Sequence, residues 1–154
     1  MRFFFYGTLL DADMRRLVLG AGRPDSALEP AVLPGHRAVL ARGQRYPILM
    51  PSTIADVPGA LTQPVDAETA ERLAYYEGTG YRAATKPVIS AAGGQVAAVV
   101  FVPIGGLKPS TVAWDLGRWQ RMDKPGALRR IAAWMAAYQP SPAVLAARRR
   151  REPH

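Results

Sequence analysis

The chain of 154 residues contains no cysteine and only two histidines, His36 and His154. The lack of cysteine excludes a disulfide framework, a thiolate nucleophile and a thiolate metal site. With only two imidazoles available, a zinc site built on histidine is nearly excluded as well. Any chemistry of this chain must therefore come from other side chains or from the backbone.

Long apolar runs are also missing. Outside the N-terminus the longest uninterrupted run is the seven residues 96–102, whereas a membrane-spanning helix needs about 20. The apolar start of the chain is followed at once by charged residues at 11, 13, 15 and 16, and no small-x-small cleavage pattern stands where a secretory signal would need one. We expect a cytoplasmic protein with no membrane partner.

The composition is that of a globular domain, with 49% hydrophobic and 21% charged residues. The formal net charge is +8, of which the four arginines of 148–151 less Glu152 supply +3. We expect a single domain over 1–140 and a basic, flexible tail over 141–154. Arginines scattered in this way are typical of a solvated surface, so a nucleic-acid partner is not expected. The alternative, RNA or DNA binding driven by the tail, predicts binding that weakens steeply with salt.

The pattern of apolar residues and turn signals predicts a small α+β domain. Prolines interrupt several of the extended segments, and proline within a sheet is confined to edges and bulges. We therefore expect a small mixed β-barrel of about five to seven strands, flanked by helices. Strands are expected at 2–6, within 31–43, 45–52 and 56–65, and as a hairpin around 91–94; helices are expected after the N-caps Asp11 and Asp66, around 114–119 and over 125–138.

The common catalytic signatures are absent from the sequence. There is no nucleophile elbow, no lysine-containing phosphate loop, no histidine pair at metal spacing and no glycine-rich dinucleotide fingerprint. If the chain is an enzyme, we expect it to work without a metal, a cofactor or a covalent nucleophile. That expectation leaves acid/base chemistry on a small molecule.

One carboxylate stands out at the end of the helix that Asp66 begins. The apolar positions 70, 73 and 74 of this helix lead, at helical spacing, to Glu77. A carboxylate that faces a core is desolvated, which raises its pKa toward the range of a useful general acid/base. In the alternative reading the helix unwinds at Tyr76 and Glu77 lies in water beside Gly78.

A second candidate lies at the start of the chain, where four aromatic residues run into Gly7 and Thr8. A strand that ends in this way just before a helix leaves several backbone N–H groups without partners, and glycine allows another molecule to approach them closely. Such a turn can bind an anion or an oxyanion. The alternative is a plain connection between a strand and a helix.

Taken together, the two segments resemble a known family. "FFFYGTLL" at 3–10, "RYPILM" at 45–50, "VPGAL" at 57–61 and "YYEGTGYR" at 75–82 follow one another as in the gamma-glutamylcyclotransferase-like, or avirulence-induced-gene-like, family. The resemblance covers roughly residues 2–103. The tyrosine after Glu77 comes four positions later, at Tyr81, as in the short bacterial and plant-like branch rather than the longer glutathione-directed one. A precise substrate therefore does not carry over.

The resemblance implies a mixed β-barrel with a cavity lined by the Tyr-Gly-Thr-Leu turn. It also implies a cofactor-independent reaction in which the α-amino group of a γ-glutamyl amide attacks its own γ-carbonyl, releasing an amine or amino acid and 5-oxoproline. Glu77 would be the general acid/base. The residues expected to bind the small-molecule γ-glutamyl substrate are Tyr6, Gly7, Thr8, Leu9, Tyr46 and Tyr81.

Several alternatives stay open at this point. The three tyrosines are also plausible core residues, and Arg45 and Arg82, which could balance a substrate carboxylate, are equally suited to a solvated surface. The same pocket could belong to a non-catalytic small-molecule binding domain, since a fold can keep its pocket without its reaction. The sequence specifies neither the leaving amine nor the oligomeric state.

Overall fold

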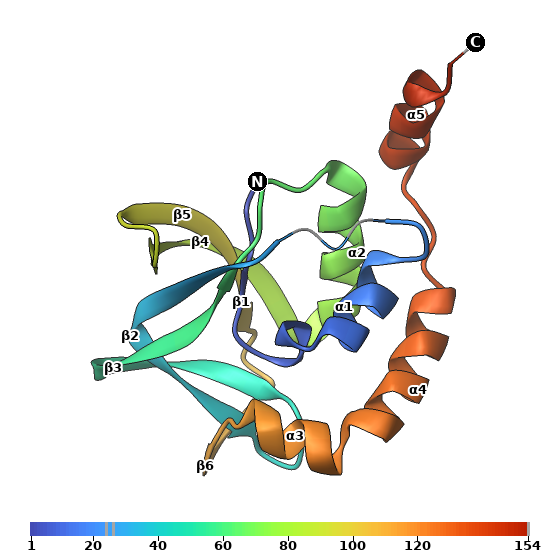
Figure 1. The fold of residues 1–154 in the computed structure, drawn as a ribbon. Helices are drawn as coiled ribbons and strands as arrows, with labels where there is room; N and C mark the ends of the chain where they lie inside the picture. The colour runs from blue at the N-terminus through green and yellow to red at the C-terminus, as the bar shows by residue number, and fades with distance from the viewer. Residues whose placement is uncertain (24, 26, 154) are drawn as a thin grey trace.

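The computed structural model describes residues 1–23, 25 and 27–153 and has two layers, with strands on one side and helices on the other (Figure 1). His154, one of the two histidines, lies outside the described residues. Two short 3₁₀ helices, η1 and η2, connect strands and helices next to the site described below. The elements are β1 (Phe4–Phe5), η1 (Thr8–Leu10), α1 (Ala12–Leu19), β2 (Glu29–Ala41), β3 (Pro47–Leu61), α2 (Ala67–Glu77), η2 (Gly78–Gly80), β4 (Tyr81–Ser90), β5 (Gln95–Pro103), β6 (Pro109–Ala113), α3 (Leu116–Met122), α4 (Lys124–Ala136) and α5 (Pro142–Arg151).

The six strands form one antiparallel sheet in the order β1-β3-β2-β4-β5, with β6 paired to β2. The α+β class and the strand number are confirmed, but the expected barrel describes this sheet only loosely. Phe3, just before β1, forms an isolated bridge with Val99 of β5, but among the described residues β1 and β5 themselves are not paired, so the sheet is not closed. The prolines do not divide β2 and β3 into short strands; the pair continues through a shift of register between Pro34 and His36.

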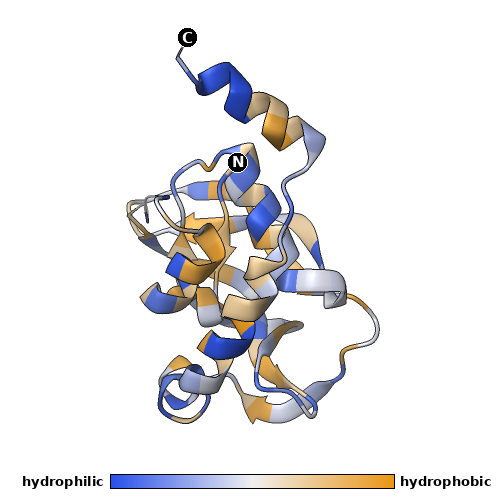
Figure 2. Ribbon diagram, turned by 90° about the vertical axis from the view of Figure 1, so that its right-hand side faces the viewer, coloured by the Kyte–Doolittle hydropathy of each residue, from blue (hydrophilic) through white to orange (hydrophobic). Residues whose placement is uncertain are grey.

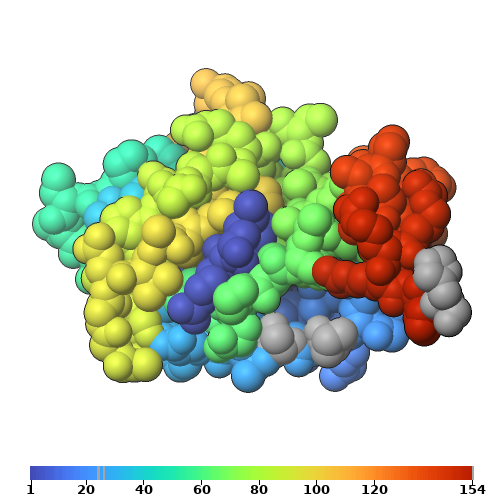
Figure 3. All heavy atoms as spheres, turned by 90° about the horizontal axis from the view of Figure 1, so that it is seen from above, coloured from blue at the N-terminus to red at the C-terminus, as the bar shows by residue number. Residues whose placement is uncertain are grey.

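The aromatic run at the N-terminus lies between the two layers. Phe4 and Tyr6 belong to the core on the sheet side, whereas Phe3 and Phe5 belong to the core on the helix side. Side chains alternate along a strand, so a strand buried on both faces is apolar at every position. Figure 3 shows this N-terminal segment, in dark blue, running between the yellow β5 and the green segment that follows β3.

The predicted starts of α1 and α2 are confirmed. Asp11 and Asp66 accept hydrogen bonds from the amides of Met14 and Thr69, as N-cap residues do. At its end, α2 stops because Gly78 adopts a positive φ of 71°. The last helical residue of α2 is Glu77.

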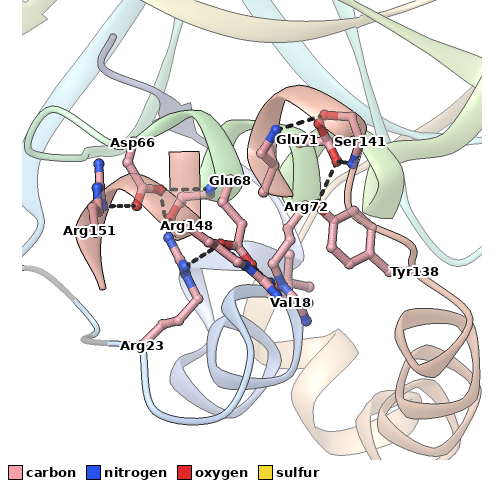
Figure 4. A network of polar contacts seen from close by, with 12 residues as sticks. Val18, Arg23, Asp66, Glu68, Glu71, Arg72, Tyr138, Ser141, Arg148 and Arg151 are labelled. Atoms are coloured by element: carbon pink, nitrogen blue, oxygen red, sulfur yellow. Dashed lines mark hydrogen bonds and ion pairs between the residues drawn. The ribbon is translucent and has the colours of Figure 1, made fainter. Parts of the chain in front are cut away.

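Within the segment 141–154 the structure contains a helix, α5, whose final turns are strongly hydrophilic (Figure 2). Arg148 and Arg151 of α5 form ion pairs with Glu68 and Asp66 at the start of α2, as Figure 4 shows. Burial alone would raise the pKa of Asp66, but hydrogen bonds from Thr69 and Arg23 lower it to about 2. The flexibility of this tail and the domain boundary at residue 140 remain predictions.

None of the helices in the described part of the chain is long and apolar enough to cross a membrane.

Candidate active site

A pocket of about 270 Å³ lies where the end of β1, the end of α2 and the start of β4 meet. All seven residues that the sequence analysis selected line this pocket, although they come from three separate parts of the chain. Their roles remain predictions. The lining residues are Phe4, Phe5, Tyr6, Gly7, Thr8, Leu9, Tyr46, Pro47, Tyr76, Glu77, Gly80, Tyr81, Phe101 and Ile131.

Among the described residues that line the pocket, Glu77 supplies the only charged side chain. It is partly buried, and among the described residues no group donates a hydrogen bond or forms an ion pair with its carboxylate. Burial without compensation raises the pKa of Glu77 to about 8. The alternative reading, in which Glu77 lies in open water beside an unwound helix end, does not match this geometry.

Three tyrosine hydroxyls lie near this carboxylate. Burial raises the pKa of Tyr6, Tyr76 and Tyr81 above the usual range, and the negative charge of Glu77 adds to each shift. These phenols therefore stay protonated throughout the physiological range. The carboxylate faces neutral hydroxyls and aromatic rings, an environment that favours its protonated form.

The turn at residues 7–9 forms the wall that carries backbone donors. Leu10 N–H donates to the carbonyl of Gly7 and Asp11 N–H donates to that of Thr8. The amides of Gly7, Thr8 and Leu9 themselves have no acceptor among the described residues. Unpaired amides beside a pocket can bind an oxyanion or a carboxylate.

Gly7 is required where it stands because Pro47 packs directly against it. A Cβ atom at residue 7 would lie 2.8 Å from Cγ of Pro47. The absence of a side chain thus lets the proline ring and the turn close one end of the pocket. The close approach is a matter of space rather than of backbone conformation, since φ of Gly7 is −117°.

The tyrosines of the pocket differ in what their hydroxyls do. Tyr6 donates to the carbonyl of Phe101 at 2.9 Å, and Tyr81 donates to that of Pro47 at 2.6 Å. Both are thereby fixed in place and can offer a ligand only their oxygen lone pairs. The hydroxyl of Tyr46 has no hydrogen-bond partner within the described part of the chain and can donate to a ligand.

Two arginines considered as carboxylate partners lie elsewhere. Arg45 is 68% exposed and pairs with Asp123 at 3.4 Å, and Arg82 is exposed on β4. Neither lines the pocket. A substrate carboxylate in this pocket must therefore be held by amides or hydroxyls.

The sequence analysis missed several lining residues, of which Tyr76 is the most informative. Its hydroxyl is hydrogen-bonded to that of Thr8, which ties the end of α2 to the turn after β1. Its position next to Glu77 was the signal that could have identified it. For Phe101 and Ile131 no local signal exists, because they reach the pocket from β5 and α4 through long-range packing.

The described residues contain no cluster of three or more histidine, cysteine, aspartate or glutamate side chains that could hold a metal ion. The polar groups that line the pocket are one carboxylate, four tyrosine hydroxyls, one threonine hydroxyl and the amides of the turn. Such a set suits proton transfer and the binding of a polar molecule.

The raised pKa of Glu77 predicts a dependence of stability on pH. Folding raises this pKa from 4.5 to about 8, so the folded protein binds the proton more tightly than the unfolded chain. The associated stability is complete below pH 4.5 and is lost as the pH rises through 8. Glu77→Gln, which stays neutral, should therefore become more stable than the wild type by a few kcal/mol at pH 9, given about 1.4 kcal/mol per pKa unit.

Urea unfolding of both proteins at pH 5 and pH 9 measures this difference. If the free energy of unfolding changes by the same amount between pH 5 and pH 9 in the wild type and in Glu77→Gln, Glu77 titrates normally.

Comparison with known proteins identifies the family of the chain. A sequence model of the family described as "Gamma-glutamyl cyclotransferase, AIG2-like" matches residues 3–121, which include every predicted site residue. AIG2-like protein A of Arabidopsis thaliana is 27% identical over 123 residues, covering 79% of this chain and 73% of the relative.

Solved structures share the fold. The solution structure of an Arabidopsis thaliana protein has a TM-score of 0.62 at 22% identity, covering 91% of this chain and 94% of that one. A structure named Gamma-glutamyl cyclotransferase has a TM-score of 0.58 at 12% identity, covering 92% and 89% of the two chains. At these identities the likeness establishes the fold alone.

Proposed function

Since the chain belongs to the gamma-glutamyl cyclotransferase, AIG2-like family, we propose that it converts a γ-glutamyl amide into 5-oxoproline and a free amine, with Glu77 as the general acid/base. The observation that carries this proposal is the carboxylate of Glu77, uncompensated by any described group and placed in a pocket with three unpaired amides. Membership of the family supports the reaction class, and the pocket supports a small-molecule substrate.

The reaction needs no nucleophile from the protein. The α-amino nitrogen of the substrate forms a bond with its own γ-carbonyl carbon, and the bond from that carbon to the leaving nitrogen breaks. An α-amino group is largely protonated near neutral pH, so a base must remove a proton before attack. Glu77 takes this proton and delivers it to the leaving nitrogen, which cannot depart as an amide anion. The attacking nitrogen loses a second proton when it becomes the lactam N–H, and Glu77 passes this proton to the released amine, which departs as an ammonium ion.

A pKa of about 8 suits both halves of this proton transfer. A carboxylate with an ordinary pKa would be too weak a base to remove a proton from an ammonium group. Once protonated, the carboxyl group of Glu77 keeps its proton inside the pocket until the leaving nitrogen accepts it. Efficient general acid/base groups have pKa values close to the working pH.

The amides of Gly7, Thr8 and Leu9 supply the second part of the mechanism. Negative charge develops on the γ-carbonyl oxygen when the ring closes, and donors already in place stabilise it at no cost of reorganisation. One donor of this kind is commonly worth roughly 3 kcal/mol. The same amides could instead hold the α-carboxylate, since no arginine or lysine lines the pocket.

The shape of the pocket contributes through positioning. A folded glutamyl arm, with its amino group against its γ-carbonyl, occupies far less space than an extended one. Holding the reacting atoms in contact can supply roughly 7 to 11 kcal/mol of the barrier. Tyr6 and Tyr81, which are fixed by hydrogen bonds to backbone carbonyls, form rigid walls for this purpose.

The direct test is incubation of the purified protein with a panel of γ-glutamyl amides, including γ-glutamyl-lysine isopeptides and γ-glutamyl amino acids, followed by assay of 5-oxoproline. We expect time-dependent release from at least one member, at a rate proportional to the protein concentration. Saturable binding without product after long incubation would contradict the proposed reaction and would indicate a small-molecule binding domain.

A further inference from the structure

We infer that Arg15, on α1 and outside the pocket, is a positioning residue for the proposed cyclisation, because it fixes the amides of Thr8 and Leu9 through the backbone. The inference rests on the proposed function. The side chain of Arg15 is only 13% exposed. It lies behind the turn that carries the unpaired amides.

The guanidinium of Arg15 donates hydrogen bonds along two of its edges. Nη1 donates to the carbonyl of Leu9 at 3.0 Å and to that of Leu10 at 2.8 Å. Nε and Nη2 donate to the carboxylate of Asp25 at 3.1 and 3.2 Å. The guanidinium is planar and rigid, so a bond along one edge also fixes the direction of its other N–H groups. The ion pair with Asp25 therefore fixes the position from which Nη1 binds the turn.

One chain of hydrogen bonds leads from Arg15 to the amide of Thr8. The peptide group between Leu9 and Leu10 accepts from Arg15 through its carbonyl and donates through its N–H to the carbonyl of Gly7 at 3.1 Å. The carbonyl of Gly7 belongs to the same planar peptide group as the N–H of Thr8. The orientation of this unpaired amide is thus determined by two linked hydrogen bonds.

A second, parallel chain leads to the amide of Leu9. The peptide group between Leu10 and Asp11 accepts from Arg15 and donates to the carbonyl of Thr8 at 3.0 Å. That carbonyl shares a peptide plane with the N–H of Leu9. Hydrogen bonds in series polarise one another in the same direction, so both unpaired amides become better donors as well as better aligned ones.

The test compares Arg15→Ala and Arg15→Lys with Arg16→Ala as a matched control. Arg16 is the neighbouring residue on α1, but its side chain is 68% exposed and, among the described residues, pairs only with Asp13. We expect kcat for 5-oxoproline release to fall about 10- to 100-fold in Arg15→Ala, since oxyanion stabilisation is weakened without being removed. The pH profile should keep its shape, and Arg16→Ala should match the wild type.

Three further measurements separate positioning from a loss of folding. Arg15 also lines a second cavity of about 280 Å³, so added methylguanidinium should enter Arg15→Ala and restore part of kcat, while leaving Arg16→Ala unchanged. Arg15→Lys, which keeps the positive charge, should lose less activity than Arg15→Ala. In amide NMR spectra the signals of Thr8 and Leu9 should shift upfield in Arg15→Ala.

Failure of this inference is distinct from failure of the proposed function. If the wild type is active and Arg15→Ala equals Arg16→Ala in kcat, the inference is wrong and the function stands. If the wild type releases no 5-oxoproline, the proposed function is wrong, and the amide NMR signals of Thr8 and Leu9 then test the inference on their own. Unchanged Thr8 and Leu9 signals in Arg15→Ala would then overturn the inference.

Discussion

Glu77→Gln is expected to reduce kcat for 5-oxoproline release by about 10³-fold, with little change in KM. Glutamine keeps the size and shape of the side chain but cannot accept the proton of the substrate ammonium group. A positioned general acid/base typically contributes a factor of roughly 10² to 10⁴, and here the same group acts in both steps. The kinetic constants of the purified variant measure the effect.

The control for this variant is Glu71→Gln, the same chemical change on the same helix. Glu71 accepts hydrogen bonds from the hydroxyl of Tyr138 and the amide of Ser141, away from the pocket. Its replacement should leave kcat close to that of the wild type. Since Glu77→Gln removes an uncompensated carboxylate, it should fold at least as well as the wild type. Retention of a tenth or more of the activity by Glu77→Gln would contradict the assignment.

Gly59→Ala is expected to have the largest effect on stability. An added Cβ atom at residue 59 would lie 2.2 Å from the carbonyl oxygen of Phe5 and 2.6 Å from Cζ of Phe4. These atoms belong to β1, which is hydrogen-bonded to β3 and carries the turn of the pocket. The methyl group must therefore displace β1 or separate the two strands.

We expect this substitution to cost about 3 kcal/mol or more, the upper range for overpacked cores, and to lower the melting temperature by roughly 10 °C. Thermal unfolding followed by circular dichroism measures it. Gly105→Ala is the matched control, since in the described part of the chain no atom beyond the adjacent residues lies within 4 Å of a Cβ at residue 105. If Gly59→Ala and Gly105→Ala have the same melting temperature, β1 does not pack on β3 as described.

The parts of the fold that depend on local chemistry could be predicted from the sequence. Asp11 and Asp66 begin helices because a carboxylate accepts from the free amides of a first turn, and Gly78 ends α2 because it can adopt a positive φ. Such signals act within four residues. They placed Glu77 at the end of its helix without any knowledge of the rest of the chain.

The features that depend on distant packing could not be predicted. The inner face of α2 was expected to include Ala74, yet Ala74 is exposed and Tyr76 faces the pocket beside Glu77. Prolines were expected to interrupt the extended segments, but β2 and β3 pair over most of their length because a bulge absorbs the irregularity. The sheet closes only if β1 pairs with β5, and these two strands are about 95 residues apart in the sequence.

The candidate site also contains features that could be predicted from the sequence and features that could not. The sequence motifs selected Glu77 and the turn at 7–9, and the structure places both on one pocket. The position of Arg15 behind that turn could not be foreseen, because its role depends on carbonyls that are exposed to it only after the turn has formed. The apolar wall from Phe101 and Ile131 likewise exists only in the assembled fold.

The most direct test of the account is the titration of Glu77 itself, followed by carbon NMR of carboxyl-labelled glutamate, with Glu77→Gln identifying the signal. We expect a pKa of about 8 and a rise of kcat/KM with pH that follows the same ionisation, because only the carboxylate can take the proton of the substrate. A Glu77 signal that titrates near 4.5, or a kcat/KM that does not change between pH 6 and 8, would contradict the account.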